Sequence, residues 1–345
     1  MGSEYVEKKQ STARRTLGYF IKFGIPLLIT VLLCNLLFRN VDFNEMMETI
    51  QRDCDWRWIG LALIISIFSH IFRAMRWQIQ LRAIDVRPSL FSLVLSIFGT
   101  YAVNLVLPRL GEVWRTGYIA KRQNASFSKI FGSMVADRLA DTVTVLLLTL
   151  VTFMLATTQL SIFFEENKEG YEKILGLLQS PWLWLGIVAC LALLVWFFQI
   201  KTENPFICKI QNFGKGIWNG FAVITKMKGK GRWLLLTVCI WGCYFSQLYV
   251  AFYAFGFTAD IVHNYGPLAV LVTFILSSIS MGVPSNGGIG PWQWAVIFAL
   301  GLYHLAAPQA TAFANLVMGT QTLLLIALGI FTFVCISLQK RKIKN

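Results

Sequence analysis

Residues 87–115 read RPSLFSLVLSIFGTYAVNLVLPRLGEVWR, which is a long apolar run held between two basic stretches. About 20 apolar residues cross the hydrocarbon core of a bilayer, so residues 88–108 are long enough to do so. Stretches rich in Lys and Arg stay on the cytoplasmic side of membrane proteins. Both flanks, residues 73–87 and 109–129, are basic. The sequence therefore predicts a segment that enters the membrane and returns on the same side.

Three residues within this run favour a hairpin over a straight crossing. Gly99 and Asn104 interrupt its apolar character, and Pro108 lacks the backbone N–H that a helix interior needs. Non-helical backbone at membrane depth is tolerated where protein or a water-filled cavity surrounds it. We therefore expect a re-entrant hairpin whose chain reverses direction within residues 88–108.

The composition extends this membrane assignment to the whole chain. Of 345 residues, 56% are apolar and 14% are charged, and the mean hydropathy is +0.60. Soluble domains carry about a quarter charged residues, so an ordinary soluble domain, a disordered chain and a disulfide-stapled secreted module are excluded. The formal net charge of +14 arises from Lys and Arg that lie between apolar runs. This pattern is typical of cytoplasmic loops and not of a nucleic-acid-binding domain.

Six further apolar runs have the length of complete membrane spans. Acidic connections at residues 42–55 and 165–172 alternate with the basic stretches, so both termini are predicted to be cytoplasmic. A second hairpin is expected in residues 266–304, where Pro284 and several glycines interrupt the run, with two short crossings as the alternative. The six predicted spans are residues 17–38, 56–72, 142–164, 181–200, 233–257 and 311–338.

The order of these segments predicts an inverted-topology repeat. The halves, residues 17–164 and 181–338, each contain two spans, a hairpin and a third span, but they start from opposite sides of the membrane. Many secondary transporters are built in this way. We therefore predict an all-α polytopic membrane protein with six full spans and two re-entrant hairpins. Its transmembrane domain covers residues 17–338, between a cytoplasmic segment 1–16 and a basic cytoplasmic tail 339–345.

The first cluster of candidate binding residues surrounds the end of the first hairpin. Arg109, Glu112 and Arg115 follow Pro108 at helical spacing, a few residues after Asn104. A charge at membrane depth is costly, so such residues usually face a cavity or one another. Guanidinium groups present fork-shaped donors that suit phosphate oxygens. The alternative is a solvated cytoplasmic turn in which Glu112 pairs with Arg115.

A second cluster, Asp137, Arg138 and Asp141, leads into the third predicted span. The two carboxylates lie four residues apart and share one helix face. We expect them to pair with Arg109 or Arg115. The alternatives are that they anchor the span at the membrane interface, or that the two like charges share a proton.

A third cluster is the glycine-rich loop with Gly287, Gly288 and Gly290, followed by Pro291. These glycines allow close backbone approach, and proline is common at the first position of a helix. A helix start that points toward the middle of the membrane favours an anionic head group. The alternative is that the glycines only permit tight packing of the hairpin.

Other chemistry has no signature in the sequence. The seven cysteines are scattered, and there is no CxxC pair, HExxH, GxSxG or nucleotide-binding GxxxxGK[ST] motif. We expect His70 and His304 to be helix-packing residues. The sequence therefore predicts no metal, no cofactor and no catalytic residue. Because no nucleotide-binding motif is present, any transport by this protein is expected to be passive or ion-coupled.

Three motifs together resemble the flippase-like family named for the lysylphosphatidylglycerol synthase transmembrane region. They are residues 104–115, 135–141 and 284–290, and the resemblance covers about residues 15–340. In two-part members, this region resembles the module that moves aminoacylated phosphatidylglycerol across the membrane, and a separate domain synthesises the lipid. Here the resemblance implies a stand-alone transporter-like protein without the synthase domain.

Two positions depart from the pattern of this family. Pro108 and Arg109 are adjacent, whereas many members have a residue between the proline and the arginine. Gln293 stands where many members carry a glutamate shortly after the glycine loop. The second departure removes an acidic function from that position.

We accordingly expect a lipid flippase or scramblase of the bacterial inner membrane, and not an enzyme. Its partners are expected to be membrane lipids, either an anionic phospholipid or an isoprenyl-phosphate-linked lipid, and no nucleic acid. A second copy of the chain or a cell-envelope enzyme is left open as a further partner. In this interpretation arginines bind the lipid phosphate, carboxylates balance them or receive a cationic head group, and glycines shape the opposite wall. The predicted binding residues are Asn104, Arg109, Glu112, Arg115, Asp137, Arg138, Asp141, Gly287, Gly288 and Gly290.

Two other functions are compatible with the same residues. The first is an integral-membrane transferase that acts on lipid-linked head groups, with Asp137 or Asp141 as a base or metal ligand. The second is a non-catalytic membrane partner of cell-envelope enzymes. A changed lipid product would indicate the first, and a complex that breaks on surface substitution would indicate the second.

Overall fold

The fold of this chain is described from a computed structural model. Within the described residues, every regular element is helical. The predicted segment 1–16, the predicted span 17–38 and the acidic connection 165–172 lie outside the described residues, as do all but a few positions of the predicted span 181–200. The described residues are 43–107, 109–156, 227–283 and 285–344, with isolated positions between 180 and 218.

Four described helices are long and apolar enough to cross a membrane. They are α4 (Trp56–Arg82), α7 (Phe127–Leu155), α12 (Lys230–Ala251) and α16 (Ala307–Lys344). These helices lie at four of the six predicted spans, so the polytopic membrane assignment is confirmed. Three of them extend well beyond the predicted limits. Residues expected in polar connections therefore belong to the helical bundle.

The first hairpin consists of α5 (Leu90–Val106) and α6 (Leu110–Gln123), which pack against each other. We predicted that the chain reverses within residues 88–108, and this is wrong in detail. One uninterrupted helix occupies most of that range, and the reversal falls between α5 and α6. The basic residues that follow the reversal therefore form the second arm of the hairpin.

Local chemistry explains why α5 continues to the end of the apolar run. The Thr100 hydroxyl donates to the Ser96 carbonyl at 2.7 Å, so polar side chains are satisfied within the helix. A single glycine such as Gly99 costs a helix only about 1 kcal/mol. The chain turns after Leu107, because the backbone N–H of Gly111 donates to Oδ1 of Asn104 at 2.8 Å and closes the reversal.

The second hairpin consists of α14 (Pro267–Ser280) and α15 (Pro291–Gly301). The interruption predicted from Pro284 and the glycines falls in the loop between them, and Pro291 starts α15. Before it, α13 (Gly256–Tyr265) meets α14 at a bend of 111°, so this pair is either a broken fifth span or a re-entrant loop. The short helices η2 (Phe252–Ala254) and α3 (Phe43–Asp53) complete the described elements.

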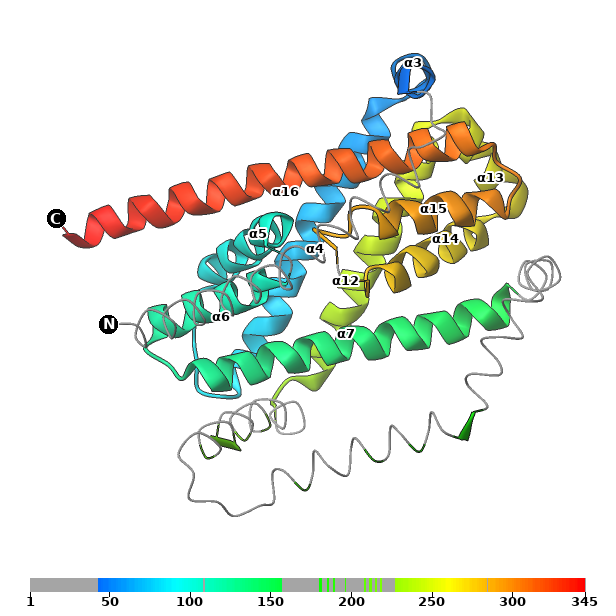
Figure 1. Cartoon of the computed structure of the whole chain (residues 1–345). Helices are drawn as coiled ribbons and strands as arrows, with labels where there is room; N and C mark the ends of the chain where they lie inside the picture. Colours follow the sequence, from blue (N-terminus) through cyan, green and yellow to red (C-terminus); the bar gives the residue numbers. More distant parts are fainter. Residues whose placement is uncertain are drawn as a thin grey trace, which may run out of the picture.

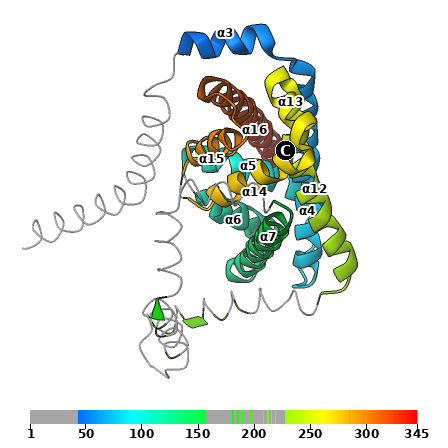
Figure 2. The same cartoon turned by 90° about the vertical axis from the view of Figure 1, so that its right-hand side faces the viewer.

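The two hairpins enter the bundle from opposite ends (Figure 1). Helices α16 and α7 run along its two sides, and α5–α6 and α14–α15 lie between them with their connecting loops toward the centre (Figure 1). Helices α4 and α12 pack against each other. After a quarter turn, the hairpins lie inside an arc made by α16, α4, α12 and α7 (Figure 2). This arrangement places the turns of both hairpins in the middle of the molecule.

Packing divides into two buried apolar clusters and an apolar outer surface. One cluster surrounds Phe252 and Phe313, and the other surrounds Trp77 and Ile97. The outward face of α7 is also apolar, and Leu146 remains 63% exposed. A large exposed apolar surface of this kind is suited to contact with lipid chains.

Candidate functional site

A cavity of about 460 Å³ lies where the turns of the two hairpins meet. Small-molecule sites commonly occupy about 300–1,000 Å³. Its walls come from α4, α5, α6, α7, α12, α14, α15 and α16 and from the loop between α14 and α15. All four long helices and both hairpins therefore contribute to a single cavity.

The two hairpins are joined by a hydrogen bond at this cavity. Nη2 of Arg109 donates to the carbonyl oxygen of Gly282 at 2.8 Å, although the residues are 173 positions apart. Arg109 has a left-handed backbone with φ of +61° and directly precedes α6. Its side chain is exposed and lines the cavity. The reversal after α5 thus aims a cationic side chain at the opposite hairpin.

A glycine permits a second contact between the hairpins. Gly287 has φ of +64°, and a Cβ atom built on it would lie 2.7 Å from Cδ2 of Leu105 in α5. A real side chain at this position would therefore be strained by its positive φ and would displace the end of the Leu105 side chain. At Gly287 this geometry fits the alternative given above, in which the glycine permits tight packing of the hairpin.

A buried network of arginines and aspartates joins α4 to α7. Nη2 of Arg76 lies 2.7 Å from both Oδ1 of Asp137 and Oδ1 of Asp141. Nη1 of Arg73 donates to Oδ2 of Asp141 at 2.7 Å and lies 3.6 Å from Oδ2 of Asp137. The side chains of Arg76 and Asp137 have no exposed surface. Removing one partner from such a network leaves an uncompensated buried charge.

The same network reaches α12 through Tyr244. Nε and Nη2 of Arg73 both donate to the Tyr244 hydroxyl, at 3.2 and 3.0 Å. Nη1 of Arg76 donates to Oγ1 of Thr237, also in α12, at 3.3 Å. Ionic and polar contacts therefore fix three long helices around the cavity.

These partners correct the pairing predicted from the sequence. Asp137 and Asp141 were expected to pair with Arg109 or Arg115, but they pair with Arg73 and Arg76. The two arginines lie in a basic stretch that the positive-inside rule assigned to the cytoplasm. Because α4 continues to Arg82, one of its faces instead carries them against α7.

Arg138 forms a second, weaker ionic group at the cavity. Its Nη2 lies 3.4 Å from Oε1 of Glu112, and its Nη1 lies 3.7 Å from Oδ2 of Asp141. Glu112 also accepts a hydrogen bond from Nδ2 of Asn104 at 3.3 Å. The side chain of Arg138 keeps 34% of its surface exposed and lines the cavity.

Arg115 lies behind the wall rather than in the cavity. Its guanidinium carbon stands 4.3 Å from the ring centroid of Trp77, and the residue is fully buried. Among the described residues, none of its side-chain nitrogens has a hydrogen-bond partner. The alternative pairing of Glu112 with Arg115 is therefore absent from the described part of the chain, and stacking on an indole face is the interaction of Arg115.

The cavity brings together most of the residues predicted from the sequence. Arg115 and Asp137 lie outside its lining, and Gly290 instead directly precedes α15. The predicted residues that line it are Asn104, Arg109, Glu112, Arg138, Asp141, Gly287 and Gly288. Arg73 also lines the cavity and was not predicted.

Uncharged polar side chains line another part of the cavity. Nε2 of Gln247 donates to Oε1 of Gln321 at 3.1 Å, and Nε2 of Gln321 donates to Oγ of Ser66 at 2.8 Å. His70 also lines the cavity and is only 3% exposed. We expected it to be a helix-packing residue, and its ring does lie 4.6 Å from that of Tyr101. Yet neither ring nitrogen has a hydrogen-bond partner among the described residues.

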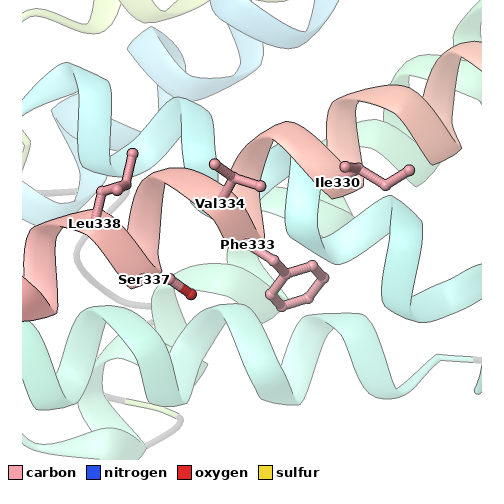
Figure 3. A pocket seen from close by; sticks show the side chains of 5 residues that line it. All are labelled: Ile330, Phe333, Val334, Ser337 and Leu338. Atoms are coloured by element: carbon pink, nitrogen blue, oxygen red, sulfur yellow. The ribbon is translucent and has the colours of Figure 1, made fainter.

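A separate hollow beside α16 has a different character. Five side chains of this one helix line the hollow (Figure 3). Four of them are apolar, and the fifth is the hydroxyl-bearing Ser337. A groove without charge on an outer helix suits a lipid chain and not a head group. The lining residues are Ile330, Phe333, Val334, Ser337 and Leu338 (Figure 3).

The charges of the central cavity favour an anion. Among the described residues, Arg73, Arg109 and Arg138 line it against Glu112 and Asp141, which leaves one excess positive charge in this set. Arginine presents several N–H donors in a planar fork that matches phosphate oxygens. Within the described ranges, no group of three or more His, Cys, Asp or Glu residues is placed to hold a metal ion.

Comparison with known proteins gives one family and two relatives. The family model described as the lysylphosphatidylglycerol synthase TM region matches residues 23–329. A UPF0104 membrane protein of Pyrococcus horikoshii is 29% identical over 108 residues, which is 30% of this chain and 32% of the relative. The glycosyltransferase AglD of Haloferax volcanii is 29% identical over 147 residues, which is 42% of this chain and 23% of the relative. The chain thus matches less than a third of the length of either relative.

Proposed function

The chain belongs to the family of the lysylphosphatidylglycerol synthase TM region, and we propose that it moves a lipid with an anionic head group between the leaflets of the plasma membrane. In this proposal the protein is a flippase or scramblase. The head group crosses through the central cavity, and the lipid chains remain in the bilayer beside the outer helices. Transport is passive or coupled to an ion gradient.

The positive cavity at the meeting point of two hairpins carries this proposal. Three arginines line it, and a buried charge is stable only when other charges or hydrogen bonds compensate it. The described carboxylates compensate these arginines incompletely, and a lipid phosphate would supply the missing negative charge. The cavity lies inside a bundle whose outer helix α7 exposes apolar residues such as Leu150 to the surroundings.

The order of the described helices supports an inverted repeat. The first half runs α4, the α5–α6 hairpin and α7, and the second runs α12, the short η2 and α13, the α14–α15 hairpin and α16. The hairpins approach the centre from opposite ends (Figure 1). Secondary transporters with inverted repeats hold their substrate where the two repeats meet. In the proposed function, the contact between Arg109 and Gly282 belongs to that meeting point.

We propose a transporter in preference to a transferase because the two candidate catalytic carboxylates are already engaged by arginines. Asp137 and Asp141 are the carboxylates suited to act as a base or metal ligand, and both lie against Arg73 and Arg76. A carboxylate that neutralises a buried guanidinium is a poor general base, since proton uptake would leave the arginine uncompensated. The name glycosyltransferase applies to the relative AglD, whose chain is much longer than the part that matches this protein.

Lipid movement in proteoliposomes tests the proposal directly. The purified full chain would be reconstituted with phosphatidylglycerol or phosphatidylethanolamine that carries a fluorescent label on an acyl chain, or with an isoprenyl phosphate that carries the label on its isoprenoid chain. An impermeant reductant would then bleach only the label in the outer leaflet. We expect faster bleaching beyond the outer-leaflet fraction for at least one anionic lipid.

Two arginine variants make this experiment specific to the cavity. Arg138→Gln removes a cavity charge and should abolish the acceleration. Arg82→Gln removes an exposed arginine at the end of α4, outside the cavity lining, and should retain it. Equal movement of anionic lipids with and without the protein, or unchanged movement in Arg138→Gln, would overturn the proposal.

A further inference from the structure

The cavity has two chemically different parts, and this difference indicates which kind of lipid head group it binds. One part is ionic and contains Arg73, Arg138 and Asp141. The other part is polar but uncharged and contains the Ser66–Gln321–Gln247 hydrogen-bond chain. An inorganic anion would need only the first part. The second part provides for a group that is attached to the anion.

Helix α4 arranges the two parts along one line. Ser66, His70 and Arg73 follow one another at intervals of four and three residues, so they lie on one face of the helix. With a rise of 1.5 Å per residue, they cover roughly 10 Å along its axis. His70 stands between the neutral residue and the charged residue. A ligand that lies along this face would meet hydroxyl and imidazole groups at one end and a guanidinium at the other.

His70 is the observation that points to a ligand. It is 97% buried and lines the cavity, and its two ring nitrogens are both buried and without a hydrogen-bond partner among the described residues. A neutral imidazole carries one donor and one acceptor, which together match a hydroxyl group. Buried polar groups without partners are rare because each costs free energy. A rotation of the His70 ring that turned a nitrogen toward the cavity would let a bound hydroxyl remove that cost.

The glutamines extend the same chemistry. A carboxamide has two donor hydrogens and one oxygen with two lone pairs. In the bonds to Ser66 and to each other, Gln247 uses one donor hydrogen, and Gln321 uses one donor and one acceptor position. Each side chain therefore keeps hydrogen-bonding capacity among the described residues. The rings of Trp241 and Trp292 also line the cavity and can cover the C–H surface of a polyol.

Among the described residues, the ionic part provides no free carboxylate for a cationic head group. Asp141 is in contact with Arg73 and Arg76, and Glu112 is in contact with Arg138. An ammonium group would have to displace a guanidinium and would face the excess positive charge of the cavity. Gln293 is neutral, and its Oε1 accepts a hydrogen bond from the backbone N–H of Gly290.

We propose that the cavity selects a phosphodiester lipid whose head group carries uncharged hydroxyls, such as a glycerol or a sugar, and that it rejects head groups bearing amines. This inference rests on the proposed function, because it names the lipid class for the same cavity. Arg73, Arg109 and Arg138 hold the phosphate. Ser66, His70 and Gln321 bind the hydroxyls.

Native mass spectrometry of the full chain in detergent tests the selectivity with matched lipids. Phosphatidylethanol, phosphatidylglycerol and phosphatidylinositol share a phosphodiester of one negative charge and differ in hydroxyls. Phosphatidylethanolamine and lysylphosphatidylglycerol add amines, and a glucosyl isoprenyl phosphate carries the hydroxyls on an isoprenoid. We expect at least one hydroxyl-bearing anionic lipid to bind about tenfold more tightly than phosphatidylethanol, because two or three neutral hydrogen bonds are gained. The amine-bearing lipids should bind more weakly than phosphatidylglycerol.

Variants separate the two parts of the site. Gln321→Leu or His70→Phe should bring the affinity ratio of the preferred lipid to phosphatidylethanol close to one. Arg138→Gln should weaken the binding of every anionic lipid. Leu323→Ala alters an exposed residue of α16 outside the cavity lining and should keep the wild-type ratio. Size-exclusion profiles and thermal unfolding of each variant confirm that it is folded before its affinity is compared.

The outcomes distinguish this inference from the proposed function. Preference for the glucosyl isoprenyl phosphate identifies a lipid-linked sugar as the source, and preference for phosphatidylglycerol or phosphatidylinositol identifies a glycerophospholipid. If anionic lipids bind without regard to hydroxyls, or if lysylphosphatidylglycerol binds most tightly, the inference fails while the proposed anion site survives. If no anionic lipid binds, both fail.

Discussion

Arg109 and Gly282 join the two hairpins of this protein by one hydrogen bond, from Nη2 of the arginine to the glycine carbonyl, at 2.8 Å. The donor is a cation that faces the cavity, and the acceptor is a neutral carbonyl in the opposite loop. A lipid phosphate is a stronger acceptor than a carbonyl because a charged partner roughly doubles the strength of a hydrogen bond. Head-group binding and the contact between the hairpins therefore compete for the same side chain, so phosphate binding favours separation of the hairpins.

Arg109→Ala is predicted to reduce lipid movement in proteoliposomes by about tenfold or more, the equivalent of one lost hydrogen bond to a charged group. Its thermal unfolding temperature in detergent should change little, because the Arg109 side chain is exposed. Arg122→Ala is the matched control, since Arg122 is an exposed arginine of the neighbouring helix α6, outside the cavity lining. Wild-type movement in Arg109→Ala would show that Arg109 does not hold the phosphate.

The buried pair between Arg76 and Asp137 gives a prediction about stability. Arg76→Met should destabilise the folded chain by about 3–5 kcal/mol, because it leaves Asp137 as a buried and less compensated charge. The double variant Arg76→Met/Asp137→Leu should recover part of this loss, since it removes both charges. Thermal unfolding in detergent measures both effects, with Arg82→Gln as the exposed control. Additive losses in the double variant would show that the pair is not coupled.

Hydropathy predicted the described long helices because a bilayer imposes one simple requirement, which is about 20 apolar residues per crossing. The predicted limits of the helices were wrong where a basic stretch was taken to end a membrane span. Arg73 and Arg76 lie in a basic stretch, and the positive-inside rule makes no distinction between an arginine in a loop and one paired inside a bundle. Residues 61–87 contain no glycine or proline, and this was the available signal that α4 continues.

The candidate site was predictable in its composition but not in its pairing. The motifs near Arg109, Asp137 and Gly287 identified segments that do meet, because each combines charge or glycine with an apolar context. Which arginine meets which carboxylate depends on how α4 is rotated against α7, and no local pattern fixes that rotation. His70 and Gln321 were missed for a related reason: an uncharged polar residue in a membrane helix carries no sign of which neighbour it faces.

Gly287→Ala tests the close approach of the hairpins. We expect destabilisation by about 1–3 kcal/mol, because the residue has positive φ and its new methyl group would meet Leu105. Gly319→Ala in α16 is the control, since no heavy atom lies within 4 Å of its ideal Cβ position, and it should be neutral or slightly stabilising. Chemical or thermal unfolding in detergent compares them. Equal stability of both variants would contradict the contact between the hairpins.

Accessibility labelling tests the predicted topology, which places Ser126 in the cytoplasm and Asn264 outside. Ser126 lies exposed between α6 and α7, and Asn264 lies exposed in α13. The junction of α6 with α7 and helix α13 lie at opposite ends of the bundle (Figure 1). Ser126→Cys and Asn264→Cys would be made separately in a chain whose seven native cysteines are replaced. An impermeant maleimide applied to intact cells should label the second variant only, and permeabilised cells should show labelling of both. Labelling of Ser126→Cys in intact cells would overturn the topology of the first half, because α5 and α6 would then open to the outside.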